Sequence, residues 1–205
     1  MKLHFTYNLT DLNQALKIAE STAEYADILG IGSLLLFKEG INAIRAFKAA
    51  FPSKEIFAES KICEKADLAV PLMAQAGASY VSILASSFHS TIKKAVDAAK
   101  RFDVKIALDL MGAPSLGQSA VDAKTLGVYC LILHRPATEE IVELDAEWRD
   151  VRDNTQLPIF ITGKIDTNNI AHLIELKPHG IMIGGNITKA DNPAQVAAQF
   201  RSLVR

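Results

Sequence analysis

The chain has 205 residues, of which 49% are hydrophobic, and this size predicts one domain with one core. Lysine plus arginine (22) nearly balance aspartate plus glutamate (23), and the net charge of -1 provides no general field for nucleic acid or an anionic membrane. We therefore expect neither partner. The polar start MKLHFTYN does not resemble a signal peptide, and no apolar run approaches the ~20 residues that span a bilayer. A cytoplasmic protein is expected.

Short apolar runs alternate with longer amphipathic segments along the whole chain. The expected strands cover residues 2-8, 26-31, 55-60, 79-84, 104-109, 128-134, 157-162 and 179-184. The expected helices lie near residues 10-22, 39-51, 65-76, 88-102, 115-126, 138-153, 166-176 and 191-204. This alternation predicts an α/β fold with parallel strands.

Two architectures fit eight strand-helix units, namely a closed (β/α)8 TIM barrel over residues 1-205 and a wide doubly wound sheet. No GxGxxG motif follows the first strand, which favours the barrel. Active sites of such barrels lie at the carboxyl ends of the strands and in the loops that follow. The candidate functional residues are therefore sought at these strand ends.

The first and third strands each end in polar residues. Asn8 could bind a sugar hydroxyl, or it could cap the helix that Thr10 and Asp11 begin. Glu59 and Lys61 alternate on the third strand, so both are expected to project into the barrel mouth, with Glu64 shortly after. This group could polarise a substrate, hold a cation through Glu59, shuttle a proton through Lys61, or form a structural ion pair.

Asp109 and His134 close the fifth and sixth strands, so both are expected to face the same mouth. Arg135 beside His134 makes a purely apolar burial of the imidazole less favourable, which favours a ligand-binding role. The other histidines lie at strand starts or within helices, and we expect them away from the mouth: His4, His89, His172 and His179.

Glycines follow the last two strands. Gly163-Lys164 comes after the seventh strand, and Gly184-Gly185-Asn186 comes after the eighth. Glycine lets a backbone approach a ligand closely, and the loops after these two strands form the usual phosphate site of a barrel. Two tight turns that need glycine are the alternative, but their joint placement predicts a site for a small phosphorylated sugar.

The two cysteines, Cys63 and Cys130, have apolar surroundings and lack the spacing of a zinc or redox motif. Both are predicted to be core or near-core thiols.

From Met1 to the C-terminus, the chain resembles the 3-hexulose-6-phosphate synthase and 3-keto-L-gulonate-6-phosphate decarboxylase group of the orotidine-monophosphate decarboxylase superfamily. The resemblance covers nearly the full length. The residues that carry it are Met1-Lys2-Leu3, Asp27-Ile28 before Gly32, the segment 38-44 (KEGINAI), Ala76-Gly77-Ala78, Asp109, His134 and the segment 184-188 (GGNIT).

The resemblance implies a homodimer with the active site near the interface, a phosphate held by the last two loops, and a magnesium ion that stabilises an enediolate. It also implies an Asp-x-Lys-x-x-Asp motif on the third strand, which reads Glu59-Ser60-Lys61-Ile62-Cys63-Glu64 here. Lys61 is retained, and both aspartates are replaced by glutamates. Glu64 corresponds to the position that reaches into the partner's active site.

Other positions depart from the resembled pattern. Asn8 replaces an aspartate that meets substrate hydroxyls, and Gly30 replaces a glutamate that ligates magnesium. The sixth strand is followed by His134-Arg135-Pro136, and Lys164 replaces the second glycine of the seventh-strand turn. We therefore expect either a magnesium ion held weakly through Glu59 or no metal at all. Restoring glutamate at position 30, together with aspartates at the altered positions, is expected to raise activity.

The leading functional hypothesis is a lyase that performs an aldol reaction, or a decarboxylation, on a ketose phosphate through an enediolate. Lys61 would shuttle the proton, Glu59 would give electrostatic support or ligate the metal, and His134 would position the substrate. Glu64 and Asp109 complete the expected catalytic group. Gly30 and Asn8 motivate a second hypothesis, a non-catalytic barrel that senses or stores a sugar phosphate. A third is an isomerase that works without metal.

Overall fold

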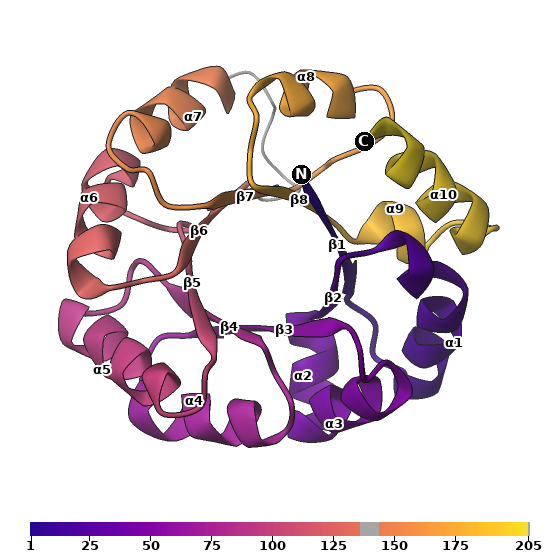
Figure 1. Cartoon of the computed structure of the whole chain (residues 1–205), viewed down its shortest axis with the longest axis horizontal. Coiled ribbons are helices and arrows are strands. Elements are labelled where there is room, and N and C mark those ends of the chain that lie inside the picture. Colours follow the sequence, from indigo (N-terminus) through magenta and orange to yellow (C-terminus); the bar gives the residue numbers. More distant parts are fainter. Residues whose placement is uncertain (136–143, 205) are drawn as a thin grey trace.

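The computed structural model describes residues 1–135 and 144–204, and these residues form a closed barrel of parallel strands surrounded by helices (Figure 1). Each strand pairs with its neighbour in the chain, and β1 (Lys2–Tyr7) also pairs with β8 (Gly180–Ile183), which closes the sheet. The predicted (β/α)8 barrel is therefore confirmed. The doubly wound alternative is wrong, because an open sheet would leave β1 and β8 unpaired with each other.

Every predicted strand is present, and all but one are shorter than predicted by one or two residues. Only β3 extends beyond its predicted end. The strands between β1 and β8 are β2 (Ile28–Ile31), β3 (Glu55–Ile62), β4 (Tyr80–Leu84), β5 (Lys105–Asp109), β6 (Cys130–His134) and β7 (Ile159–Thr162).

The helices cover the outside of the barrel (Figure 1). Those described are α1 (Leu12–Thr22), the 3-10 helix η1 (Ala23–Tyr25), α2 (Ser33–Glu39), α3 (Ile41–Ala50), α4 (Ala66–Gln75), α5 (His89–Lys100), α6 (Leu116–Leu126), α7 (Leu144–Arg152), α8 (Ile170–Glu175), α9 (Gly185–Thr188) and α10 (Pro193–Leu203).

Two α-helices, α2 and α9, and the 3-10 helix η1 were not predicted. The expected helix 39-51 is preceded by α2, and Gly40 separates α2 from α3 with φ 60° and ψ -148°, a conformation essentially reserved for glycine. The short α9 follows β8 directly. The predicted helix 138-153 is seen as α7, and its first part, like Pro136, lies outside the described residues.

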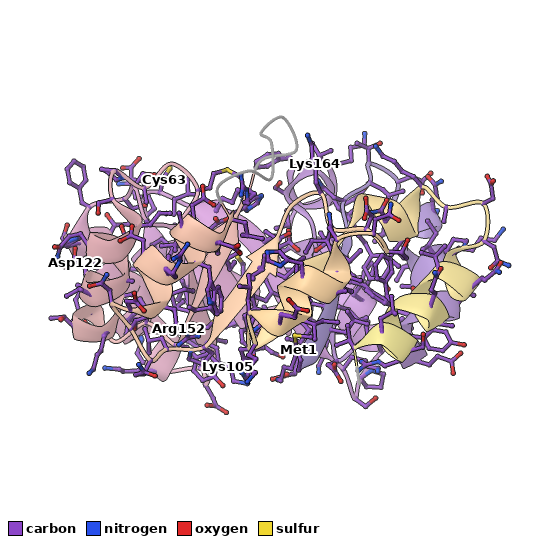
Figure 2. The ribbon with its side chains drawn as sticks, turned by 90° about the horizontal axis from the view of Figure 1, so that it is seen from above. Met1, Cys63, Lys105, Asp122, Arg152 and Lys164 are labelled. Atoms are coloured by element: carbon purple, nitrogen blue, oxygen red, sulfur yellow. The ribbon has the colours of Figure 1, made fainter. Side chains whose placement is uncertain are left out.

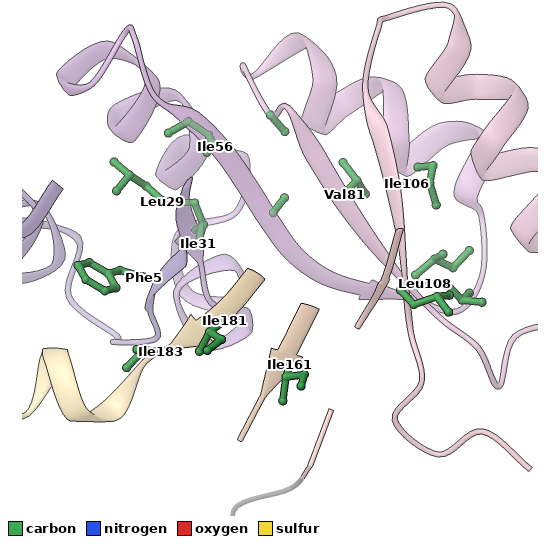
Figure 3. Packing of buried hydrophobic residues seen from close by; sticks show 14 of the residues in the cluster. Phe5, Leu29, Ile31, Ile56, Val81, Ile106, Leu108, Ile161, Ile181 and Ile183 are labelled. Atoms are coloured by element: carbon green, nitrogen blue, oxygen red, sulfur yellow. The ribbon is translucent and has the colours of Figure 1, made fainter. Parts of the chain in front are cut away.

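Apolar side chains pack in two layers, one on each side of the strands. The outer layer lies between strands and helices, and Figure 3 shows members of it, including Ile56, Val81 and Ile181. The inner layer fills the barrel with Ile28, Phe57, Tyr80, Ala107, Cys130, Ile132, Phe160 and Met182. The barrel is thus a packed core, and a ligand must bind at one of its ends.

All strands run in the same direction, so their carboxyl ends gather at one end of the barrel. Lys164 and Cys63 lie at this end, whereas Met1 and Lys105 lie at the opposite end (Figure 2). Among the described residues, no helix combines the length and apolar character needed to cross a bilayer.

Candidate active site

A cavity of about 580 Å³ opens at the carboxyl ends of the strands. It brings together residues from β1, β3, β6, β7 and β8 with the loops that follow them, as the barrel prediction requires. Its lining is Thr6, Asn8, Ser33, Glu59, Lys61, Met111, His134, Thr162, Gly163, Lys164, Ile165, Met182, Ile183, Gly184, Gly185, Asn186 and Lys189.

The end of β3 is irregular, and this irregularity places Lys61. The register between β3 and β4 shifts between Ala58 and Ile62, and Lys61 has a φ of 47°, which is uncommon for a residue other than glycine. Ser82 on β4 stabilises the irregularity through both its side chain and its backbone. Its Oγ accepts the Lys61 N–H at 3.0 Å, and its carbonyl accepts the Ser60 hydroxyl at 2.9 Å.

Lys61 reaches across the cavity to β5 and β6 rather than to its neighbours in the motif. Its Nζ lies 2.6 Å from Asp109 Oδ2 and 3.2 Å from His134 Nδ1. His134 Nδ1 lies 3.1 Å from the same Asp109 oxygen. The other oxygen, Oδ1, accepts the Met111 N–H at 3.0 Å. Lys61, Asp109 and His134 thus form one cluster, which we call the lysine cluster.

Asp109 is the buried member of the lysine cluster, with 2% of its side chain exposed, against 23% for Lys61. Burial alone would raise the pKa of Asp109, but the bonds and charges of His134 and Lys61 outweigh it and hold this pKa below the ordinary value. The carboxylate is therefore charged at neutral pH, and it fixes a lysine and a histidine that both line the cavity.

Glu59 has different partners. Its Oε1 accepts the Thr6 hydroxyl at 2.5 Å and lies 3.3 Å from His4 Nε2. Burial alone would raise the pKa of Glu59, but contact with His4 and Thr6 and the charge of Lys61 lower it below the ordinary value. His4 does not line the cavity, in keeping with the expectation that it lies away from the mouth. It is nevertheless in contact with the site, because the alternation of β1 turns it into the barrel, where its Nε2 lies 3.3 Å from Glu59 Oε1.

The magnesium site implied by the resemblance does not fit these residues. Gly30 provides no carboxylate, and a Cβ at this position would lie 2.0 Å from His4 Nε2 and 2.7 Å from Glu59 Oε1. The volume of the missing ligand is therefore filled by an imidazole. Among the described residues, no group of three histidine, cysteine or carboxylate side chains could hold a metal ion. The gain in activity expected from glutamate at position 30 stays a prediction, but that side chain would collide with His4 unless the imidazole moves.

The predicted phosphate residues gather on the opposite side of the cavity. Gly163 has φ 109°, and a Cβ there would lie 1.9 Å from the carbonyl oxygen of Arg135, so the β7 turn requires glycine. Gly185 faces open space, with nothing within 4 Å of a Cβ built there. The Asn186 amide donates to the Ile165 carbonyl and so ties the two loops together.

Two lysines extend from this side of the cavity. Lys164 has φ 37°, directly after the Gly163 turn, and Lys189 follows α9. Both are exposed and both line the cavity. The cavity therefore has a cationic rim beside glycine backbone that an anion can approach closely.

Asn8 and Glu64 have separate positions. Asn8 lines the cavity, and its Oδ1 accepts the Leu34 N–H at 2.9 Å, so it caps α2, whereas Asp11 caps α1 through the Gln14 N–H. The proposed cap of α1 by Asn8 is wrong. Glu64 does not line the cavity; its side chain is 77% exposed and lies 3.8 Å from Lys65.

The cysteine prediction is half correct. Cys130 is buried inside the barrel, but Cys63 is exposed because β3 ends at Ile62 and the next residue begins the loop.

Several cavity residues were not predicted: Thr6, Ser33, Met111, Ile165 and Lys189. The alternation of β1 gives a signal for Thr6, which shares a strand face with Asn8. Lys189 follows the predicted phosphate segment closely. Ser33 and Met111 carry no comparable signal, because their positions depend on loop paths.

The closed fold and a polar cavity at its carboxyl end place the chain among the (β/α)8-barrel enzymes. More specifically, the chain belongs to the Orotidine 5'-phosphate decarboxylase / HUMPS family, whose model matches residues 1–200.

Similar proteins match over the full chain. The 3-hexulose-6-phosphate synthase of Bacillus subtilis (strain 168) is 25% identical, covering 100% of this chain and 99% of that protein. The 3-hexulose-6-phosphate synthase of Mycobacterium gastri is 28% identical, covering 100% of both. A crystal structure of 3-hexulose-6-phosphate synthase superimposes with a TM-score of 0.93 at 28% identity, covering 99% of both chains.

Proposed function

We propose that the chain is a sugar-phosphate lyase that cleaves or forms a carbon–carbon bond of a 3-hexulose 6-phosphate through an enediolate. The full-length similarity to 3-hexulose-6-phosphate synthases supports the reaction class. The observation that carries the proposal is the lysine cluster, because it places an ammonium group in the cavity between a buried carboxylate and an imidazole. A barrel that only stores a sugar phosphate has no need of this arrangement.

The chemistry assigns a role to each member of the cluster. In aldol cleavage, the hydroxyl β to the ketone gives its proton to the His134 imidazole, and its carbon leaves as an aldehyde when the carbon–carbon bond breaks. The electron pair of that bond remains on the ketose fragment as an enediolate, and His134 later returns a proton to Lys61, whose Nζ lies 3.2 Å from His134 Nδ1. The Lys61 ammonium stabilises the developing negative charge and supplies the proton that the enediolate carbon takes up. Asp109 holds Lys61 in place, and His134 positions the substrate hydroxyls. Glu59 and Asn8 complete the polar surface of the cavity.

The phosphate of the substrate is assigned to the opposite side of the cavity. Backbone N–H groups of Gly163, Gly184 and Gly185 would surround the anion, and Lys164 and Lys189 would add charge. Asn186 supports this assignment because its bond to Ile165 keeps the loops after β7 and β8 together. Binding the phosphate on one side leaves the reacting carbons over the lysine cluster.

A homodimer is proposed as the working form. Large apolar side chains are exposed on α2 (Leu34 and Phe37), on α4 (Leu68 and Leu72) and directly before α5 (Phe88). These helices occupy one part of the ring, with α3 between α2 and α4 (Figure 1). Glu64 lies in the loop between β3 and α4, on the same part of the ring. Association through this face would cover the apolar residues and bring Glu64 to the partner's cavity.

A cytoplasmic location is proposed with this function. Cys63 is an exposed free thiol and Cys130 a buried one, a state that a reducing compartment maintains.

Steady-state turnover tests the proposal. Purified protein should cleave 3-hexulose 6-phosphate and should act more slowly on 3-keto-L-gulonate 6-phosphate. Preference for the second substrate would change the assignment to a decarboxylase. If both sugar phosphates bind in calorimetry but neither is converted, the sugar-phosphate-binding barrel replaces the lyase.

A further inference from the structure

The Glu59 carboxylate lies beside His4 and Thr6 of β1 and beside Gly30 of β2. His4 is completely buried in β1, and its ring centroid lies 5.0 Å from that of Phe57. Its Nε2 lies 3.3 Å from Glu59 Oε1, which is within ion-pair distance but without hydrogen-bond geometry, and the Thr6 hydroxyl donates a hydrogen bond to the same oxygen. These two contacts to the Glu59 carboxylate both come from residues of β1.

Gly30 is the reason that the imidazole fits. β1 and β2 are paired in parallel, with Thr6 opposite Gly30, and a Cβ on Gly30 would meet His4 Nε2 at 2.0 Å and His4 Cδ2 at 3.0 Å. Real Cβ atoms do not approach other atoms to 2.0 Å, so any other residue at position 30 requires the imidazole to move. The buried position of His4 therefore depends on the absence of a side chain at Gly30.

The packing of His4 against Gly30 also determines what can bind at the floor of the cavity, which is the surface around Glu59. Magnesium requires near-octahedral oxygen ligands, and it is usually held by one or two carboxylates. Glu59 Oε1 is already in contact with Thr6 and His4. The space in front of Gly30 holds the His4 imidazole rather than a second carboxylate.

We propose that His4 is a positioning residue that fixes the Glu59 carboxylate from inside the barrel, so that the site acts without magnesium. That the site is catalytic rests on the proposed function, whereas the positioning of Glu59 and the absence of magnesium rest on the packing of His4 against Gly30. Lys61 then provides the cationic group for the enediolate.

The first test is metal binding, measured without turnover. Mn²⁺ is the probe, and the loss of the free-ion signal in electron paramagnetic resonance reports its binding. The wild-type protein and the His4→Ala variant should leave the signal of free Mn²⁺ unchanged. The His4→Ala/Gly30→Glu double variant, which has both the space and the second carboxylate, should reduce the free Mn²⁺ signal, with an affinity at least about tenfold above the detection limit that applies to the wild type. Wild-type binding that disappears in Glu59→Gln would overturn the proposal.

The second test is independent of metal and remains informative if the double variant fails to fold. Gly30→Ala should lower Tm by roughly 5 °C or more in the wild-type background, and by less than half of that in a His4→Ala background. Equal losses in the two backgrounds would show that the two positions are not coupled, which contradicts the proposal.

Turnover then separates this inference from the proposed function. Equal rates in EDTA and in magnesium support both. Turnover only with magnesium would sink the metal-free inference while leaving the lyase intact. Absence of turnover, with no Mn²⁺ bound and with coupled Tm losses, would remove the lyase and leave the packing of His4 against Gly30 in place.

Discussion

Lys61 Nζ and Asp109 Oδ2 lie 2.6 Å apart across the barrel, although the two residues are separated by 48 positions in the chain. The contact joins the end of β3 to the end of β5, and His134 on β6 shares the same oxygen. A buried carboxylate with two basic partners is costly to disturb, because removing one partner leaves the others unsatisfied.

The first prediction concerns acid stability. The pKa of Asp109 is lowered in the folded chain relative to the ordinary value of 3.8, so this group stabilises the fold above that value and ceases to do so as the pH falls through its folded pKa. Asp109→Asn should lower the free energy of unfolding at pH 7 by about 1–3 kcal/mol. The difference from wild type should shrink below about pH 4. Urea titrations between pH 3 and 7 measure it, and a difference that stays constant would contradict the assignment.

The second prediction concerns Ser82. Its side chain and carbonyl hold the β3 irregularity that gives Lys61 its positive φ. Ser82→Ala should lower kcat about tenfold or more, with a smaller effect on KM, because a displacement near 1 Å of a reacting group is expensive. The matched control is Ser79→Ala, because Ser79 Oγ accepts the Ile56 N–H at the other end of the same strand pair. An equal effect of the two substitutions would show that Ser82 has no special role.

The third prediction concerns the phosphate. Lys164→Ala combined with Lys189→Ala should weaken binding of ribulose 5-phosphate, used as a phosphorylated probe, about tenfold or more, since each lysine contributes a charge near the anion. Lys177→Ala is the control, because Lys177 also has a positive φ, of 54°, and is exposed, but does not line the cavity. Calorimetry at low and high salt gives the comparison. Unchanged affinity in the double variant would place the phosphate elsewhere.

The fourth prediction concerns assembly. Phe37 is 79% exposed on α2, so Phe37→Asp should disrupt an interface at this face while leaving the monomer folded. Light scattering at micromolar concentration should give a dimer for wild type and a smaller mass for the variant. Val121→Asp on α6, which is also partly exposed, should remain dimeric. A monomeric wild-type protein would exclude the shared site and leave Glu64 without a catalytic role.

Periodicity was sufficient to predict eight strand-helix units, because apolar runs and amphipathic segments have different periods. The choice of a closed barrel over a doubly wound sheet depended on the absence of a GxGxxG motif and on the family resemblance. Asp109, His134 and Lys61 could be placed at one mouth, since each follows or ends a strand. The partner of Lys61 could not be predicted. It depends on the β3 irregularity, and a strand drawn with strict alternation gives no sign of the shift after Ala58.

The contact between His4 and Glu59 is the clearest feature that sequence reasoning missed. A histidine at the start of an apolar strand is usually part of a core, and its neighbours in sequence give no indication of Glu59. The informative signal was Gly30, a glycine at a β2 position where a side chain would point into the barrel. Only the register between β1 and β2 relates this space to the imidazole of His4.

The central claim is that Lys61 carries out the chemistry of a sugar-phosphate lyase, and turnover of 3-hexulose 6-phosphate by wild type and by Lys61→Ala tests it most directly. Lys65→Ala is the matched control, since Lys65 has a similar positive φ of 54° but is exposed outside the cavity. The account predicts that Lys61→Ala lowers kcat by roughly 10²–10⁴ while the sugar phosphate still binds, and that Lys65→Ala retains wild-type turnover. Wild-type turnover in Lys61→Ala, or equal background rates in all three proteins, would contradict it.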